Sequence, residues 1–347
     1  MKKIKAGIAF NLKRPIGKCG DKPPDFYAEY DTPSTISSIK TALQSFPAEV
    51  IPIEASAGFF KHIKSLKPNI VFNIAEGLGG DGREAQVPAI LDMLGIPYTG
   101  SGVATLVNCL KKSLTKIILL HHKIPTPAFA EISNGNRECL NGLKFPLIVK
   151  PVQEGSSKGI TADSVVHNHH ELKCEIEKII NFYKQPALIE EFIEGREFTV
   201  GIMGNGKLET FPIMELDFSE CQESFYTYKN KSKHWKKVRY LCPAPIDRKK
   251  EKRLKTLALA AFKALGCNDF ARVDIRFNNK TNEAFVIDIN PIPGFTPNYS
   301  DFPMMAEKAG YTYEKLIHTI FTLALKRHGI KCGGAEVKEK PQIHGEI

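Results

Sequence analysis

Two stretches near the C-terminal end of the chain carry polar residues that could bind a metal ion. Arg272 and Asp274 lie two positions apart in the first stretch, and Asp288 and Asn290 lie two apart in the second. Side chains two apart on a β-strand point to the same face, so each stretch presents a polar pair if it forms a strand. If the two strands are neighbours, two carboxylates and an amide oxygen converge, and Mg²⁺ prefers such oxygen ligands. The pattern therefore favours a metal site over two edge strands with solvated charges.

A segment rich in glycine and serine follows an apolar stretch in the middle of the chain. Residues 145–160 read FPLIVKPVQEGSSKGI, in which Lys150 precedes a loop that contains Glu154, Ser156 and Ser157. Small residues let backbone N–H groups approach an anion closely, while hydroxyl groups and a lysine add donors and charge. Such a loop could bind phosphate groups, but an ordinary hairpin turn has a similar composition. The segment alone leaves both interpretations open.

A third segment, residues 187–200, reads ALIEEFIEGREFTV and places glutamates among apolar residues. Carboxylates such as those of Glu190 and Glu197 could accept hydrogen bonds from an adenine amino group or from ribose hydroxyls. The turn at Glu194-Gly195 is equally typical of an ordinary hairpin, and by itself the segment favours that interpretation.

Strand-like and helix-like patterns alternate in the N-terminal part of the chain. Thr32 and Pro33 offer an N-cap and a first-turn proline, and apolar residues follow at helical spacing. Strands separated by helices imply a parallel sheet, so we expect a doubly wound α/β domain there. A proline-rich break at 124–127 suggests a domain joint. The expected strands are 5–10, 49–54, 69–74, 146–150, 187–192, 197–203, 208–216, 271–277 and 284–290, and the other expected helices are 86–94, 112–121, 170–183, 251–266 and 313–328.

The composition is that of a globular protein with two or three modest domains: 347 residues, 42% hydrophobic and 25% charged. We expect no membrane span, because no stretch approaches ~18 uninterrupted apolar residues. Eight scattered cysteines indicate reduced thiols in the cytoplasm. The net charge of +10 favours anionic ligands. The basic run 229–239, KNKSKHWKKVR, is more typical of a solvated loop than of nucleic-acid binding, and a mobile lid over an anionic substrate also fits it.

Taken together and in this order, the segments resemble the D-alanine–D-alanine ligase branch of the ATP-grasp superfamily. The similarity runs from about Val71 to about Ile317. The segments that carry it are GGDGREAQ and IPYTGSG (79–102), KKSLTK (111–116), IVKPVQEGSSKG (148–159), IEEFIEGREFTVG (189–201), FYTYKNKS (225–232), CPAP (242–245), ARVDIRF (271–277) and DINPIPGFTPNYS (288–300).

The resemblance implies an ATP-grasp fold of the α/β class (α+β in part) with three domains. These are an N-terminal α/β substrate domain (1–110), a central ATP-grasp subdomain (111–205) and a C-terminal ATP-grasp subdomain with the metal site (206–330). We expect the tail, 331–347, to be disordered because it lacks apolar periodicity. The resemblance implies a cytoplasmic enzyme that acts on small amino acids, with a role in peptidoglycan biosynthesis, and it leaves a homodimer open.

The resemblance also implies roles for individual residues. Those expected to contact ATP are Lys112, Lys150, Glu154, Ser156, Ser157, Glu190, Glu191, Phe192, Ile193 and Glu197. Two Mg²⁺ ions, or Mn²⁺ in their place, would be held by Asp274, Asp288 and Asn290. Lys231 would reach the γ-phosphate from a flexible loop, Arg272 and the backbone N–H of Gly294 would stabilise an oxyanion, and Ser300 would bind the carboxylate of the second substrate. Ser156 would also belong to the family's hydrogen-bonded triad.

These roles describe an ATP-dependent ligase that forms a carbon–nitrogen bond. A carboxylate is a poor electrophile, so ATP would convert it to an acyl phosphate that an amine then attacks. Positive charge offsets charge on the transferring phosphoryl group, and Arg272 with an N–H meets the oxyanion. A closing loop would keep water from the acyl phosphate.

The sequence departs from the family pattern mostly on the substrate side. The loop after the first strand, NLKRPIGKCG, lacks the glutamate that binds the amine of the first D-alanine. Where the family has His-Gly, this chain has Glu76-Gly77, and where the family has GEDG, it has GGDG. Ser232 replaces the family's lid tyrosine, and Asp288 replaces one metal-binding glutamate. The turn before Ser300 is one residue longer than in the family.

If the first substrate is an amino acid, its ammonium group requires another acid. Glu76 is the first candidate, and Glu29 and Asp31 are the second, although Asp31 could simply cap the following helix. The alternatives that stay open are a ligase that makes a different dipeptide or amide, and a non-catalytic protein that binds ATP or nucleic acid.

Overall fold

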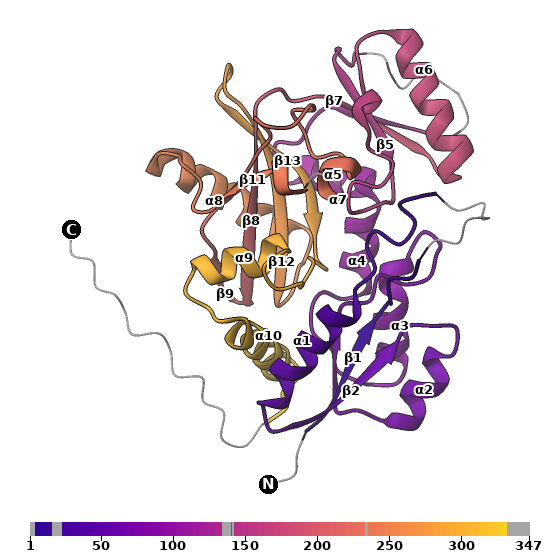
Figure 1. Cartoon of the computed structure of the whole chain (residues 1–347), viewed down its shortest axis with the longest axis vertical. Helices are drawn as coiled ribbons and strands as arrows, with labels where there is room; N and C mark the ends of the chain where they lie inside the picture. Colours follow the sequence, from indigo (N-terminus) through magenta and orange to yellow (C-terminus); the bar gives the residue numbers. More distant parts are fainter. Residues whose placement is uncertain (1–3, 16–22, 134–139, 141, 233–234, 332–347) are drawn as a thin grey trace.

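The computed structural model describes residues 4–15, 23–133, 140, 142–232 and 235–331 (Figure 1). The expected disordered tail thus lies outside the described residues, apart from Lys331. The described secondary structure forms three sheets with helices packed on them. No helix in the described part of the chain is long and apolar enough to cross a membrane. The cysteines within the described ranges are free thiols.

The N-terminal sheet is parallel, with strands in the order β2-β1-β3. Its strands are β1 (Ile4–Phe10), β2 (Ala48–Glu54) and β3 (Ile70–Asn73), and its helices are α1 (Pro33–Gln44), α2 (Phe59–Leu66) and α3 (Gln86–Met93). Apolar residues of α1 pack on one face, whereas those of α2 and α3 pack on the other. The prediction of a doubly wound α/β arrangement is therefore confirmed.

The start of α1 also follows the sequence prediction. The Thr32 hydroxyl caps the helix by accepting a hydrogen bond from the backbone N–H of Thr35, and Pro33 occupies the first helical position. Asp31 is therefore not the capping residue, and its side chain is left for another role.

A four-stranded sheet, in the order β4-β7-β5-β6, forms a separate unit at the top of Figure 1. Its elements are β4 (Phe129–Ile132), β5 (Leu147–Pro151), β6 (Val165–Val166), α6 (His169–Lys178), β7 (Ala187–Glu191) and a short π-helical turn (Ile179–Tyr183). α6 packs its apolar residues against β5 and β7. Because β5 and β7 are neighbours, Lys150 and Glu190 lie on adjacent strands.

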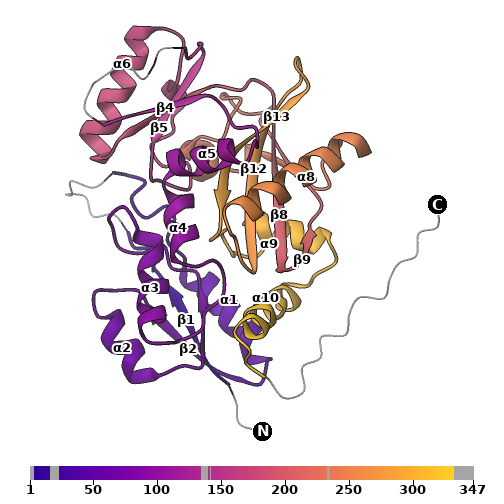
Figure 2. The same cartoon turned by 180° about the vertical axis from the view of Figure 1, so that it is seen from behind.

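The remaining strands form a six-stranded sheet in the order β11-β10-β8-β12-β13, with β9 also paired to β8. The strands are β8 (Arg196–Asn205), β9 (Lys207–Thr210), β10 (Met214–Asp217), β11 (Arg239–Leu241), β12 (Phe270–Asn278) and β13 (Glu283–Asn290). One face carries α8 (Arg248–Ala264), seen in front of β8 and β12 in Figure 2. The other helices are α4 (Val103–Leu110), α5 (Lys112–His121), α7 (Tyr228–Ser232), α9 (Asp301–Lys308) and α10 (Tyr313–Arg327).

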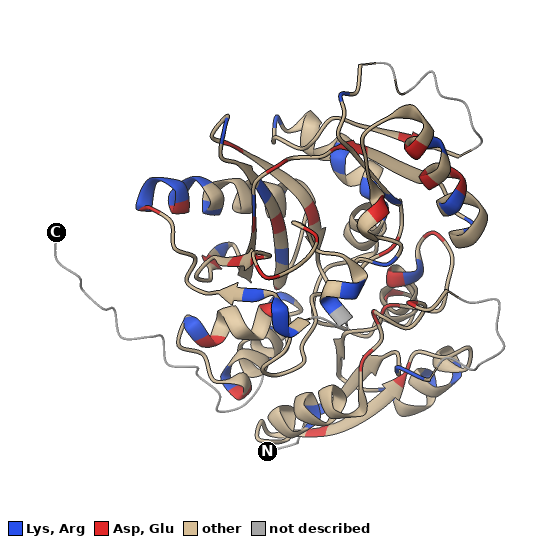
Figure 3. Cartoon of the chain, turned by 45° about the horizontal axis from the view of Figure 1, so that its top comes forward, with Lys and Arg blue, Asp and Glu red and all other residues tan. Residues whose placement is uncertain are grey.

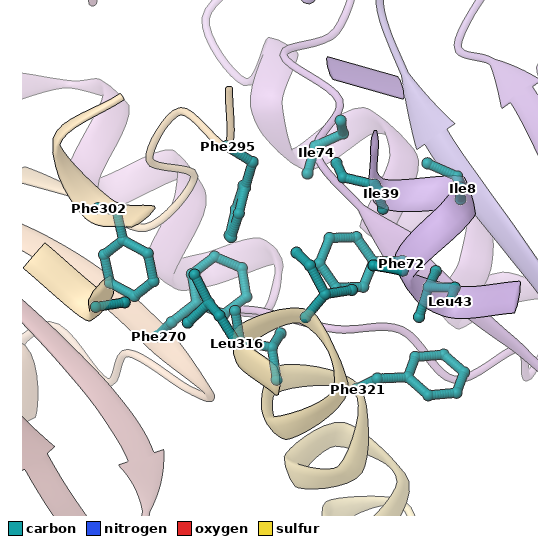
Figure 4. Close-up of a cluster of buried hydrophobic side chains, with 14 of the residues drawn as sticks. Ile8, Ile39, Leu43, Phe72, Ile74, Phe270, Phe295, Phe302, Leu316 and Phe321 are labelled. Atoms are coloured by element: carbon teal, nitrogen blue, oxygen red, sulfur yellow. The ribbon is translucent and has the colours of Figure 1, made fainter. Parts of the chain in front are cut away.

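One continuous apolar core joins the N-terminal sheet to the end of the chain (Figure 4). Ile39 and Leu43 of α1 belong to this core together with Leu316 and Phe321 of α10. Phe295, from the turn after β13, contacts Phe72 of β3, with ring centroids 5.8 Å apart. The turn that follows the predicted metal-binding strand is therefore anchored in the same core as the N-terminal sheet.

Two expectations about these elements need correction. The single strand expected at 208–216 is two strands, β9 and β10, because Pro212 lies between them and cannot donate to a strand ladder. β8 hydrogen-bonds to β10 and β12, so sheet pairing groups it with the later strands, whereas a boundary at residue 205 would separate them. The division into domains therefore stays a proposal. A boundary near Gly195 between the central and C-terminal subdomains agrees better with this strand pairing than one at residue 205 does. The sequence pattern also missed α2, α4 and α9.

Candidate functional site

Two adjoining cavities lie where the three sheets meet. The central cavity has a volume of about 190 Å³ and the side cavity one of about 110 Å³. The side cavity lies against the four-stranded sheet, with Lys150 and Glu190 in its lining, whereas the central cavity reaches Asp31 and Glu76 of the N-terminal part. The residues that line both cavities are Lys112, Gly155, Ser156, Tyr226, Lys231, Arg272, Asp288 and Asn290.

The polar pairs of β12 and β13 converge as their spacing predicts. The antiparallel register places Asp274 opposite Asp288 and Arg272 opposite Asn290. The Asn290 side-chain amide donates to Asp274 over 3.0 Å, and the Thr199 hydroxyl donates to Asp274 over 2.7 Å. The two carboxylates and the amide therefore share one face of the sheet, at the boundary between the two cavities.

Arg272 is held tightly on this face. Its guanidinium group donates two hydrogen bonds to Asp274, of 3.0 and 2.9 Å, and one of 3.1 Å to Asp301. Burial alone would raise the pKa of Asp274, but the charge of Arg272 and the hydrogen bonds to it hold that pKa below its usual value. Asp274 is therefore ionised, and Arg272 is fixed at the wall of the central cavity.

The glycine- and serine-rich segment forms a turn over the boundary between the cavities. Ser156 and Ser157 both have positive φ angles, 50° and 55°, which residues other than glycine rarely adopt. Lys158 pairs with Glu154, and the Gln185 side-chain amide donates to Glu154 over 2.9 Å. Such strained backbone persists only where neighbours hold it, and it is common at ligand-binding turns.

Three charged side chains form a buried group at the edge of the side cavity. The Glu190 carboxylate lies 2.9 Å from the Lys150 ammonium nitrogen and 3.0 Å from that of Lys116. Lys116 also donates to the Thr126 hydroxyl over 2.8 Å. Burial lowers the pKa of Lys116 to about 8 despite the charge of Glu190. Lys112, by contrast, lies 3.7 Å from Asp288 and donates to the backbone carbonyl of Glu154, so it bridges the metal-binding strand and the turn.

The far wall of the side cavity comes from the 190–197 segment and Arg276. Arg276 donates to the Glu197 carboxylate and to the backbone carbonyl of Ile193, both over 3.0 Å, and stacks over the Phe192 ring. The Glu191 side chain instead accepts a hydrogen bond from the backbone N–H of Lys144, outside the cavity. Glu197 thus lines this wall with a carboxylate held by Arg276, while Phe192 and Ile193 contribute apolar surface.

α7, in the basic run, contributes Tyr228 to the lining of the central cavity and Lys231 to the lining of both cavities. The Lys231 ammonium group lies over the Tyr226 ring, 5.5 Å from its centroid, and the Tyr299 hydroxyl donates to the backbone carbonyl of Lys231 over 3.2 Å. The backbone N–H of Tyr228 donates to Ile160, which ties α7 to the serine-rich turn. Burial and the neighbouring charge of Arg272 lower the pKa of Lys231. The basic run thus places Lys231 in the lining of both cavities, and its role as a lid stays a prediction.

The turn after β13 brings Gly294 next to Ser300. A methyl group at Gly294 would lie 2.6 Å from the Ser300 hydroxyl oxygen, so only glycine fits. The backbone N–H of Thr296 donates to that same oxygen over 3.1 Å. Gly294, Ser300 and Arg272 together line the side of the central cavity that faces Asp288.

The acids of the N-terminal part have different environments. Glu29 accepts hydrogen bonds from Arg83 (2.8 and 3.0 Å), from Lys158 (2.9 Å) and from the backbone N–H of Gly155 (2.6 Å). Although burial would raise its pKa, Arg83 and Lys158 lower the pKa of Glu29 to about 2. Asp31 and Glu76 line the central cavity without such partners in the described part of the chain.

Comparison with known proteins identifies the family. A family model described as "D-ala D-ala ligase C-terminus" matches residues 123–322. A D-alanine–D-alanine ligase of Desulforudis audaxviator is 33% identical over 300 residues, covering 84% of this chain and 92% of that protein. The chain belongs to the D-alanine–D-alanine ligase family. A Sinorhizobium fredii protein named "Uncharacterized protein y4sG" is also 33% identical to the present chain, and the match covers 84% of this chain and 87% of that protein.

Solved structures share the fold of the present chain, which confirms the prediction of an ATP-grasp fold. The D-alanine–D-alanine ligase of Bacillus anthracis complexed with ATP gives a TM-score of 0.74 at 24% identity, covering 94% of this chain and 99% of that chain. The VanG D-Ala:D-Ser ligase of Enterococcus faecalis gives a TM-score of 0.73 at 22% identity, covering 93% of this chain and 100% of that chain.

The fold brings all of the predicted site residues to the lining of the two cavities. Glu29 lines the central cavity too, but its environment does not suit the expected role of binding a substrate ammonium group. Both of its carboxylate oxygens already have partners, because Arg83, Lys158 and Gly155 converge on it. Glu191 lines the side cavity, but its carboxylate likewise already accepts a hydrogen bond, from the backbone N–H of Lys144.

Several residues that shape the ligase site were not found from the sequence. Arg83 and Glu84 belong to a segment that carried the family resemblance, yet nothing in their spacing indicates that they are buried beside the cavities. Lys116 and Lys158 lie in two other such segments. The available sign was that each is a basic residue within a segment that matches the family. The acidic partners of Lys116 and Lys158 are distant in the sequence, so the pairs could not be found from it.

Proposed function

We propose that this ligase uses ATP and Mg²⁺ to join two amino acids through an acyl-phosphate intermediate. The observation that carries the proposal is the position of Asp274, Asp288 and Asn290 on one face of β12 and β13, between two adjoining cavities. The side cavity is the proposed site of the nucleotide, and the central cavity is that of the amino acids. The γ-phosphate would then lie where the two cavities meet.

The side cavity offers ATP both a wall and charge. Phe192 and Ile193 provide apolar surface for the adenine, and Glu197 provides an acceptor for the ribose hydroxyls. Lys112 and Lys150 supply positive charge for the phosphates, and the turn through Ser156 and Ser157 adds N–H and hydroxyl donors. Glu190 pairs with both Lys116 and Lys150, so its main proposed role is to hold Lys150 in place. A contact between Glu190 and the adenine would be additional.

The residues present fit Mg²⁺, because they offer hard oxygen ligands beside the proposed phosphates. The side-chain N–H of Asn290 donates to Asp274, so the amide oxygen of Asn290 is left for the ion. The Oδ2 atom of Asp288 lies 3.7 Å from the Lys112 ammonium nitrogen. When bound, Mg²⁺ or Mn²⁺ would offset negative charge on the phosphate groups. The shorter side chain of Asp288 still reaches the boundary of the cavities.

In the first step, a carboxylate oxygen of the first amino acid attacks the γ-phosphorus of ATP, and ADP leaves. In the second step, the amine nitrogen of the second amino acid attacks the acyl carbon, loses a proton, and inorganic phosphate leaves. Arg272 and the Gly294 N–H line the cavity where the oxyanion of the tetrahedral intermediate would form. Ser300 is placed to orient the second substrate, and Lys231 meets the γ-phosphate from the lid.

The identity of the amino acids is the open part of this proposal. Relatives are named D-alanine–D-alanine ligases, and a protein with the same fold is named a D-Ala:D-Ser ligase. D-Alanine is therefore the first substrate to test, with a different dipeptide or amide as the alternative. We also propose a cytoplasmic location, and a homodimer stays a prediction. Nucleic acid is not the proposed partner, because Lys231 of the basic run lines the central cavity. A second group of basic residues lies on α8, outside the basic run (Figure 3).

Phosphate release from ATP and Mg²⁺, measured with pairs of D- and L-amino acids, tests the proposal. We expect release that requires an amino acid and is accompanied by a dipeptide detectable by mass spectrometry. Asp288→Asn should abolish it, whereas Glu283→Gln, at the exposed start of the same strand, should not. ATP-independent product, or ATP turnover without any coupled product across the whole panel, would overturn the proposal.

A further inference from the structure

Three carboxyl groups on the N-terminal side of the central cavity have no partner among the residues that the structure describes. Asp31, Glu76 and Glu84 all line this cavity. Within the described ranges, no hydrogen bond or ion pair reaches their side-chain oxygens. Their neighbour Glu29 is different, because Arg83, Lys158 and the Gly155 N–H neutralise it.

Two of these acids, Glu76 and Glu84, come close enough to each other to share a ligand. Single carboxylate oxygens of Glu29, Glu76 and Glu84 lie within 4.8 Å of one another. Glu84 is only 9% exposed, and its carboxyl group nevertheless reaches the cavity. Burial and the charges of Glu84 and Glu29 raise the pKa of Glu76 well above its usual value, and burial raises the pKa of Glu84 to about 7. In an empty site these groups therefore oppose one another's ionisation.

Burial raises the pKa of Glu84 more than the nearby charges of Arg83 and Lys112 lower it, so these basic residues only partly stabilise the ionised acid. Arg83 and Lys158 already pair with Glu29 and Glu154. Buried carboxylates without a partner are costly, so the cavity wall is complementary to a cation that arrives with a ligand. A single ammonium group can donate hydrogen bonds to one or two of the three acids and leaves the third without a partner.

On the basis of the proposed ligase reaction, we propose that the first substrate is an amino acid with a second cationic nitrogen. Its α-ammonium and side-chain ammonium groups both bind among Asp31, Glu76 and Glu84. Since the oxygens of Glu76 and Glu84 lie within 4.8 Å of each other, the two nitrogens must be close together. Diaminopropionate and diaminobutyrate meet that requirement, whereas D-alanine supplies only one of the two charges.

A divalent cation is the other ligand that three carboxylates could take. It fits this wall less well, because the oxygens of Glu29 already accept from Arg83, Lys158 and Gly155. A metal ion would have to displace those donors, whereas an ammonium group can donate to Asp31, Glu76 and Glu84 without displacing any of them.

Matched substrates test the inference directly. Phosphate release is measured with diaminopropionate against alanine and with diaminobutyrate against aminobutyrate, in both configurations, with the second substrate saturating. We expect kcat/KM to be at least about tenfold higher for each diamino acid than for its neutral counterpart. Glu76→Gln and Glu84→Gln should each lower that ratio, whereas Glu307→Gln, exposed on α9, should not change it.

Calorimetry in the presence of ADP and Mg²⁺ gives a second readout that does not depend on turnover. Each diamino acid should bind at least about tenfold more tightly than its neutral counterpart, and both glutamine variants should weaken that binding. If no amino acid supports phosphate release, the proposed function fails, and the binding ratio alone decides this inference. A preference for neutral amino acids, or an equal ratio in wild type and both variants, would overturn it. Saturable Mn²⁺ binding without nucleotide that Glu76→Gln abolishes would assign the acids to a metal instead.

Discussion

The Glu29 carboxylate accepts a hydrogen bond of 2.6 Å from the backbone N–H of Gly155, a residue 126 positions further along the chain. A methyl group at Gly155 would lie 2.5 Å from the Glu29 oxygen, so the two residues fit only because position 155 is glycine. Asp25 makes a similar contact, accepting from the backbone N–H of Gly159 over 2.9 Å. The N-terminal segment that carries both acids therefore holds the serine-rich turn in place over the proposed phosphate site.

Glu29→Gln should weaken ATP binding and lower stability, because it removes one of the two carboxylates, Glu29 and Glu154, that pair with Arg83 and Lys158. We expect a loss of roughly 3–5 kcal/mol in the free energy of unfolding, because the two buried cations then share a single carboxylate. Urea denaturation and calorimetry with ATP measure the two effects, and Glu177→Gln on the exposed face of α6 is the control. Unchanged ATP affinity would show that the turn does not depend on this contact. Gly155→Ala should reproduce the loss of affinity through the clash described above.

Lys112→Ala and Lys150→Ala should each weaken ATP binding by about tenfold or more, because each removes a charge-assisted contact to phosphate. Lys150→Ala also leaves Glu190 paired only with Lys116, so its fold should be checked by circular dichroism. Lys263→Ala, exposed near the end of α8, should bind ATP as the wild type does. If both variants retain wild-type affinity by calorimetry, the side cavity is not the phosphate site.

Asp288→Asn should reduce turnover by orders of magnitude or shift the Mg²⁺ dependence to much higher concentration. The change removes one anionic ligand but keeps the size of the side chain, so the strand register with Asp274 should persist. Initial rates across a Mg²⁺ titration measure the effect. Wild-type turnover with the same Mg²⁺ dependence would contradict a catalytic role for this carboxylate.

Gly294→Ala should lower kcat with little effect on stability. The added methyl group would meet the Ser300 hydroxyl at 2.6 Å, so the turn must move and the Gly294 N–H shifts with it. A displaced oxyanion donor typically costs about 10²–10³ in kcat. Gly79→Ala is a suitable control, since a methyl group there contacts nothing within 4 Å. An equal kcat in the two variants would rule out an oxyanion role for this turn.

Asp31→Asn should stabilise the free protein at alkaline pH but not at acidic pH. Burial raises the pKa of Asp31 to about 7, so folding favours its neutral form. The penalty for ionisation is absent below the ordinary pKa of an aspartate, near 4. It grows as the pH rises and is complete above about 7, where it amounts to at most about 4 kcal/mol.

The measurement for Asp31 is the free energy of unfolding of wild type and variant between pH 5 and pH 8.5, without substrate. The difference should increase with pH and level off above about 7. Asp163→Asn, at an exposed position, should show no such trend. A difference that is constant with pH would mean that folding does not raise the pKa of Asp31.

Local patterns in the sequence were sufficient where the chemistry lies within one element. The two-residue spacing of Arg272 with Asp274, and of Asp288 with Asn290, predicted that each pair shares one face of a strand, because side chains alternate along any strand. Thr32 and Pro33 similarly marked the start of α1 through hydrogen bonding and a fixed φ angle. The family resemblance then supplied the ATP-grasp fold.

Tertiary structure alone decided which of the acids near the substrate cavity is free. The sequence offered Glu76 as the first candidate and Glu29 and Asp31 as the second, and only the fold brings Arg83 and Lys158 onto Glu29, from 54 and 129 positions away. The same packing buries Glu84, whose segment gives no sign of it. A carboxyl group binds a ligand or a neighbouring side chain according to distances of a few ångströms, and residues so far apart in the sequence acquire those distances only when the chain folds.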